Sequence, residues 1–164
     1  MKGILTLFTV FGLDFATKKW ADETLPLNCS KEIVRNRLYF RHIKNSGVAY
    51  NKFSGRQKGI LLFTGGLLAY YSGVFLRVLL GKKSEKYTLP LALVLGGGYG
   101  NFWERARKGQ VTDFLFVPAE GRNMPIFNLA DVAILLGTVG LAIISCQKCE
   151  KNENYCCRTR TNVV

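Results

Sequence analysis

The sequence predicts an all-α membrane protein of one domain, residues 1–164, with four transmembrane helices and a small β platform beside the membrane. Three observations support this fold class. Hydrophobic residues make up 48% of the chain, and they gather in four long runs that contain few charges. The charged residues concentrate between those runs. One connecting segment partly alternates apolar and charged residues, which is typical of strands.

The four apolar runs predict spans at about 3–20, 59–80, 87–105 and 126–147. A bilayer core of about 30 Å needs about 20 mostly apolar residues per helix. The second run has no charge before Arg77, and the third is uncharged from Tyr87 to Trp103. Pro90 suits the first turn of that third helix. The fourth run contains a single charge, Asp131.

The first run is the weakest of the four, because Asp14 interrupts it shortly before Lys18 and Lys19. A secretory signal peptide that starts with Lys2 is the alternative. No small-x-small cleavage site follows the run, however, and Trp20 lies where an aromatic residue of the membrane interface is expected. We therefore expect a spanning helix.

Four spans place the loops 21–58 and 106–125 on one side of the membrane. Both termini and the tail 148–164 then lie on the other side. Residues 22–58 and 104–124, on the side of these loops, contain most of the Lys and Arg residues, which by the positive-inside rule would put the loops in the cytoplasm. Four cysteines in the last nineteen residues favour the opposite orientation, because thiols persist in a reducing compartment. The residues alone leave the orientation open.

Two segments outside the spans predict different structures. Residues 29–50 contain IVRNRLYFRHI, where apolar and charged residues partly alternate, so short strands are expected. The tail 148–164 is polar, and we expect it to be disordered. A metal site built from the four cysteines near the C-terminus is an alternative, but their spacing matches no familiar ligand framework.

The composition narrows the classes of function. A net charge of +12 suits a nucleic-acid binder, but such a protein would not contain apolar runs of this length, so no nucleic-acid partner is expected. A single histidine excludes multi-histidine metal sites, and we predict no metal and no other cofactor.

Six polar residues near the span ends are placed to meet at one mouth of the helix bundle. They are Asp14, Asn101, Arg105, Asp113, Asn128 and Asp131. A charge at the centre of a membrane helix costs about 2.5–3.5 kcal/mol, so polar residues within spans indicate function. Local roles are the alternative: Asp14 pairs with Lys18, and Arg105 reaches the membrane interface. Asn128 would cap the fourth helix, with Asp131 in its first turn.

Asp113, in the loop after the third span, and Asp131 predict a carboxylate pair. Two close carboxylates do not both ionise easily, so one keeps a proton. Such a pair supplies a general base to activate water and a general acid for the leaving group, without a metal or a histidine. For the nearby glycines 96–98 and 100 we favour a structural explanation, since small residues let membrane helices approach closely. The alternative is that they keep the wall beside the site low and leave room for a substrate backbone.

Four sequence blocks resemble lipoprotein signal peptidase, also called signal peptidase II. DFATK at 14–18 resembles the family's Asp-x-x-[Ser/Thr]-Lys, and NSGVAY at 45–50 resembles its Asn-x-Gly-x-Ala-Phe. The segment 96–114 resembles the block around the first catalytic aspartate, and FNLAD at 127–131 resembles that of the second. Each block alone is weak, but the order and spacing of the set are specific.

Three positions depart from the family pattern. Glu104 stands where the family usually has Asp, Tyr50 where it has Phe, and Gly98 where it has Ala. Glu104 keeps the charge on a longer side chain, so the resemblance does not define its contacts.

The resemblance implies a monomeric aspartic endopeptidase in the bacterial cytoplasmic (inner) membrane, with cytoplasmic termini and an extracytoplasmic β cradle. Its catalytic aspartates would lie near the outer face, which conflicts with the positive-inside count and takes precedence over it. Its partners would be membrane lipids and prolipoprotein substrates, cleaved just before a cysteine that carries diacylglycerol.

The resemblance also implies roles for particular residues. The catalytic pair would be Asp113 and Asp131. Residues that bind substrate or shape the site would be Asn45, Gly47, Asn101, Arg105 and Asn128. Structural support would come from Asp14, Lys18 and Glu104. The alternative class is a channel or transporter subunit whose permeation path the polar residues line. The position of the polar residues at one mouth, and not through the bundle, disfavours that class.

Overall fold

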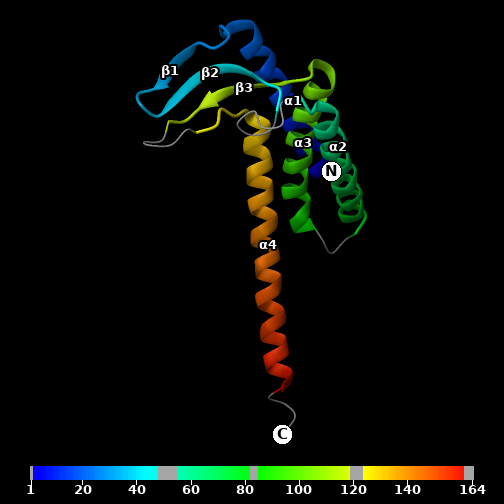
Figure 1. Ribbon diagram of the computed structural model, residues 1–164. Coiled ribbons are helices and arrows are strands. Elements are labelled where there is room, and N and C mark those ends of the chain that lie inside the picture. The colour runs from blue at the N-terminus through cyan, green and yellow to red at the C-terminus, as the bar shows by residue number, and fades with distance from the viewer. Residues whose placement is uncertain (1, 48–54, 82–84, 119–123, 161–164) are drawn as a thin grey trace.

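The computed structural model describes residues 2–47, 55–81, 85–118 and 124–160. Its elements follow in the order α1 (Lys2–Thr24), β1 (Ser30–Val34), β2 (Leu38–Asn45), α2 (Gln57–Leu80), α3 (Glu85–Lys108), β3 (Val111–Phe116) and α4 (Leu129–Arg160). Figure 1 shows the helices side by side, with the three strands gathered at one end of the bundle. The C-terminal end of α4 lies far from that sheet.

The strands form an antiparallel sheet in the order β1-β2-β3. The strands expected within 29–50 are therefore confirmed for the described part of that segment. The expectation that Asp113 lies in a loop is wrong, because residues 111–116 pair with the second edge of β2. In this register Ile43 lies opposite Asp113, and Asn45 lies opposite Val111. The pairing brings Asn45 and Asp113 to the same end of the sheet.

Aromatic packing fixes the sheet against the end of α1. The Trp20 ring lies edge-on to Phe40, with centroids 5.0 Å apart, and to Phe114, at 6.3 Å. Aromatic pairs of this kind contribute about 0.5–1.5 kcal/mol beyond their buried area. Because Phe114 follows Asp113 directly, this contact also positions the strand that carries the carboxylate.

α3 is the central helix, since it packs against α1, α2 and α4. Its glycines allow the close approach. A Cβ atom on Gly97 would lie 2.4 Å from the carbonyl oxygen of Ala130 in α4, and one on Gly96 would lie 2.8 Å from that of Leu7 in α1. Neither position has room for a side chain, which confirms the structural explanation of the glycine run.

Two described helical segments are long and apolar enough to cross a membrane, Gln57–Leu80 and Leu129–Gln147, with hydropathies of 1.6 and 2.2. In the 18-residue apolar window of each segment only 17% is buried, and large apolar side chains such as Leu62 (81% exposed) and Leu135 (63%) point outward. Soluble proteins rarely expose apolar surface on this scale. α1 and α3 do not reach the same hydropathy because polar residues and glycines dilute their apolar runs.

The start of α3 differs from expectation. The helix begins at Glu85, so Pro90 lies in its second turn and not in its first. Proline removes one hydrogen bond close to the helix start, and its ring is used in packing. A Cβ on Gly140 of α4 would lie 3.2 Å from the Pro90 ring, so a small residue faces the proline across the interface.

The end of α4 also differs from expectation, since the helix continues to Arg160 and residues 148–160 are not disordered. No glycine or proline follows Gly140, and the Lys, Glu and Gln residues beyond it are good helix formers. The side chains of 148–160 lie outside the described residues, and with them three of the four cysteines considered as metal ligands.

Candidate active site

A cavity of about 770 Å³ begins at the sheet end of the bundle and extends along α2, α3 and α4. The charged and carboxamide side chains that line it are Asn45, Asn101, Arg105, Asp113, Asn128 and Asp131. Its apolar lining includes Leu67, Leu68, Ile134 and Leu141. Five of the six polar residues expected at one mouth therefore meet here, and Asn45 joins them from β2. Asp14 is not among the lining residues, because it lies on the other side of α3.

Asp113 enters the cavity from the middle of β3 and is only 3% exposed. One carboxylate oxygen accepts a hydrogen bond from Asn128 Nδ2 at 2.7 Å, and the other accepts one from Asn45 Nδ2 at 3.1 Å. Burial, together with the charge of nearby Asp131, raises the pKa of Asp113 to about 6 despite these donors. The group can therefore gain or lose a proton near neutral pH.

Asp131 lies in the first turn of α4, where it forms a reciprocal cap with Asn128. The Asn128 N–H donates to the Asp131 carboxylate, and the Asp131 N–H donates to Asn128 Oδ1, both at 3.1 Å. This pattern satisfies two amides that a helix start otherwise leaves unpaired. Asn101 Nδ2 donates to the second Asp131 oxygen at 2.9 Å. Asn128 thus contacts both carboxylates of the pair.

Arg105 connects α3 to the segment that follows β2. Its Nη2 donates to the Gly47 carbonyl oxygen at 2.9 Å, and the Gly47 N–H donates to Asn45 Oδ1 at 3.0 Å. Arg105 is 8% exposed, so the alternative in which it reaches the membrane interface is wrong. Within the described part of the chain its buried Nε has no hydrogen-bond partner, which leaves one donor at the cavity wall.

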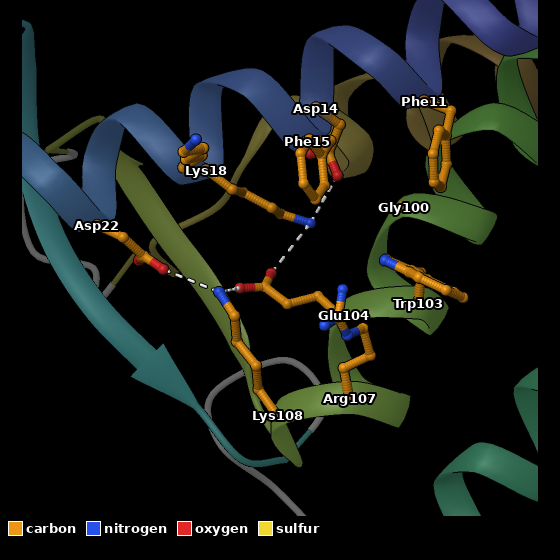
Figure 2. A pocket seen from close by; sticks show the side chains of 11 residues that line it. Phe11, Asp14, Phe15, Lys18, Asp22, Gly100, Trp103, Glu104, Arg107 and Lys108 are labelled. Carbon is orange, nitrogen blue, oxygen red and sulfur yellow. Dashed lines mark hydrogen bonds and ion pairs between the residues drawn. The ribbon is translucent and has the colours of Figure 1, made fainter.

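Asp14, Lys18 and Glu104 form a buried ionic cluster behind the site (Figure 2). The Lys18 ammonium lies 2.7 Å from Asp14 and 3.6 Å from Glu104. It also donates to Asn101 Oδ1 at 2.6 Å, which turns the amide NH₂ toward Asp131. The predicted pairing of Asp14 with Lys18 is therefore confirmed, but the cluster also orients a residue of the cavity.

Asp14 and Glu104 each connect elements that carry the two carboxylates. Asp14 accepts the Ala130 N–H at 3.0 Å and so contacts the first turn of α4. Glu104 accepts the Thr112 N–H at 3.0 Å and the Thr112 hydroxyl at 2.6 Å, directly beside Asp113. Both carboxylate oxygens of the longer Glu side chain at position 104 thus accept hydrogen bonds.

The ionic cluster continues outward through Thr112, Asp22, Lys44 and Lys108, and the sequence did not predict this outer part. Thr112 is fully buried, and its hydroxyl lies within hydrogen-bond distance of Asp22 and Lys44 as well as Glu104. Burial opposes ionisation of Asp22, but hydrogen bonds from Lys44 and Lys108 outweigh it and lower its pKa to about 2. These residues lie in polar segments where charges are ordinary, so no sequence signal distinguished them.

The arrangement suits proton transfer better than metal binding. Among the described residues, no three His, Cys, Asp or Glu side chains are grouped as metal ligands. Two carboxylates instead share one cavity, one of them with a raised pKa, and amide donors hold both in place. Such a site can deprotonate water and protonate a leaving group.

Comparison with known proteins gives consistent matches over most of the chain. The family model described as "Signal peptidase (SPase) II" matches residues 6–147. The lipoprotein signal peptidase of Lactococcus lactis subsp. cremoris (strain SK11) is 36% identical over 147 residues, which cover 87% of this chain and 94% of the relative. That of Trichormus variabilis is 32% identical over 145 residues, which cover 88% and 89%.

Two solved structures, both described as bacterial membrane enzymes, have a similar fold. The first, at 2.3 Å resolution, aligns with a TM-score of 0.80 and 27% identity over 92% of this chain and 90% of its own. The second, at 1.9 Å resolution, aligns with a TM-score of 0.76 and 26% identity over 87% and 91%.

Proposed function

The chain belongs to the signal peptidase II family, and we propose that Asp113 and Asp131 are the catalytic pair with which it removes signal peptides from prolipoproteins. The observation that carries this proposal is the position of both carboxylates in one cavity, each held by Asn128. The protein is thus an aspartic endopeptidase. Asn45, Gly47, Asn101, Arg105 and Asn128 shape the site, and Asp14, Lys18 and Glu104 support it.

The pair divides the two proton transfers of peptide hydrolysis. The ionised carboxylate removes a proton from water, whose oxygen attacks the scissile carbonyl carbon. The protonated carboxyl then donates to the amide nitrogen as the C–N bond breaks. The raised pKa of Asp113 supports its role as the acid. Asp131 then acts as the base, with its carboxylate held in place by Asn101 Nδ2 and the Asn128 N–H.

The shape of the cavity supports a membrane-embedded substrate. Its apolar part extends from the carboxylates along α2 and α4, and these helices do not pack extensively against each other. The hydrophobic segment of a signal peptide fits such a lining. The cysteine with its thioether-linked diacylglycerol would follow the scissile bond, with its acyl chains in the surrounding bilayer.

A cleavage assay tests this function directly. The purified chain in detergent, incubated with a lipid-modified prolipoprotein, is expected to release the signal peptide, and EDTA should not change the rate. The same precursor without diacylglycerol is the matched control and should be cleaved poorly. Absence of cleavage would overturn the proposed function. Activity lost with EDTA and restored by zinc would indicate a metallopeptidase.

We place all four helices across the bacterial cytoplasmic membrane, as a monomer, with the loops 21–58 and 106–125 outside. Two helices have sufficient hydropathy alone, and the packing of α1 and α3 against them supports four spans. The sheet lies at one end of the bundle (Figure 1). Asp113 belongs to that sheet and Asp131 to the first turn of α4, and both line one cavity, so one orientation applies to all of them. The outer side fits a substrate that enters from the outer leaflet, although the loops are basic.

Thiol labelling tests this orientation. In a variant that keeps only Cys29, which is exposed, a membrane-impermeant reagent should label intact spheroplasts. In a variant that keeps only Cys156 and Cys157, labelling should require lysis, because those residues follow the fourth span. The reverse pattern would invert the orientation and remove the carboxylates from the outer face.

A further inference from the structure

A second cavity, of about 290 Å³, lies between α1 and α3 on the opposite face of α3 from the catalytic cavity. Figure 2 shows this cavity, with the buried ionic cluster along its inner wall. Its lining residues are Phe11, Asp14, Phe15, Lys18, Lys19, Asp22, Gly100, Trp103, Glu104, Arg107 and Lys108. None of these residues takes part in the proposed proton transfers, so the cavity requires a separate explanation.

The lining changes from apolar to cationic along the helix axes. Phe11, Phe15 and Trp103 line the end of the cavity that is farther from the sheet. Phe15 and Trp103 are about half exposed. Lys19 and Arg107 lie one or two turns nearer the sheet. With a rise of 1.5 Å per residue, Phe11 and Lys19 are separated by about 12 Å along α1. An apolar base with cations at the helix ends matches the polarity of a lipid at a membrane interface.

The acidic residues of the cavity are already paired. Asp14 contacts Lys18, while Asp22 and Glu104 both contact Lys108. Within the described ranges Arg107 makes no ion pair, and its guanidinium lies 5.5 Å from the centroid of the Trp103 ring.

Lys19, the other cation at the mouth of the cavity, forms only a weak ion pair. Its ammonium lies 3.8 Å from Glu23, and both side chains are more than 60% exposed. Exposed pairs of this kind contribute little. Lys19 and Arg107 therefore leave positive charge available at the mouth of the cavity.

We propose that this cavity binds an anionic phospholipid of the leaflet on the sheet side. Lys19 and Arg107 contact its phosphodiester, and an acyl chain lies along Phe11, Phe15 and Trp103. Both helices have their carboxyl ends on this side, and the negative ends of their dipoles disfavour anions, so the two cations are required for the preference. The site depends on the helices being in a membrane, but it depends neither on which face is outer nor on peptidase activity.

Quenching of Trp103 fluorescence tests the proposal. The chain has two tryptophans, and Trp20→Phe leaves Trp103 as the only one. This variant is reconstituted in phosphatidylcholine bilayers that contain equal fractions of either brominated phosphatidylglycerol or brominated phosphatidylcholine. We expect the anionic lipid to bind next to Trp103 with roughly tenfold higher affinity than phosphatidylcholine. At a low brominated fraction, brominated phosphatidylglycerol should therefore quench Trp103 more strongly than brominated phosphatidylcholine.

Two further variants in the same background separate a specific site from general attraction to an anionic surface. Lys19→Gln with Arg107→Gln should abolish the preference. Lys58→Gln removes an exposed cation at the start of α2, outside the cavity, and should retain it. Equal quenching by both lipids, or a preference that survives the double substitution, would overturn the proposal. Loss of the preference on adding inorganic phosphate would also overturn it, because the site would then bind phosphate without a lipid.

Discussion

Asp113→Asn and Asp131→Asn are each expected to lower the cleavage rate of a lipid-modified prolipoprotein by about 10²- to 10⁴-fold, the range for loss of a general acid or base. An amide can neither remove the proton from water nor donate one to the leaving nitrogen. The remaining carboxylate has no partner with which to share a proton. Initial rates of the purified variants in detergent measure the effect, at several pH values so that a shifted optimum is not mistaken for a loss.

The fold should tolerate both substitutions, which makes the loss of rate interpretable. Asparagine keeps the shape of aspartate, and an amide oxygen at position 113 can still accept from Asn128. Glu32→Gln provides a matched control, since it neutralises an exposed carboxylate of β1 in the same sheet and should leave the rate unchanged. Near wild-type turnover of either aspartate variant would remove that residue from the mechanism.

The helices are predictable from the sequence because each one corresponds to a continuous apolar run. The expected span 59–80 coincides closely with α2, Gln57–Leu80, and the apolar run before position 147 lies within α4. Polar residues within such runs are equally visible, because a charge in an apolar stretch is costly and needs a reason. Asn101 and Asp131 could therefore be assigned to one site before their contacts were known.

The sheet contacts and the outer ionic cluster are not predictable in this way. β3 becomes a strand because β2 offers it an edge, and that edge is distant in the sequence. Lys44 reaches Asp22 across 22 positions, and Thr112 reaches the same carboxylate across 90. Neither contact leaves a periodic pattern, because each depends on how the sheet meets the ends of α1 and α3.

The start of α4 shows that a local role and a functional role can be one and the same. Asn128 and Asp131 form the helix cap that propensity alone would predict. The same hydrogen bonds fix the Asp131 carboxylate beside Asn101 and leave Asn128 Nδ2 directed at Asp113. The cap is therefore the means by which the two carboxylates are held in one cavity, and no choice between the explanations is needed.

Lys18 has the most consequential position behind the pair. It is 4% exposed, and its ammonium contacts Asp14, Glu104 and the Asn101 amide oxygen. Asp14 in turn accepts the Ala130 N–H and lies so close to Gly100 that a Cβ there would be 2.4 Å from its carboxylate.

Lys18→Met is therefore expected to lower the free energy of unfolding by about 3–5 kcal/mol, the cost of removing one partner of a buried ion pair. Cleavage should also fall, because the Asn101 amide loses the contact that directs it toward Asp131. Thermal unfolding in detergent and initial rates measure the two effects. Adding Asp14→Asn should restore part of the stability by removing the unpaired carboxylate. Lys31→Met, at an exposed position, should change little, whereas a Lys18→Met protein as stable as wild type would contradict this account of the cluster.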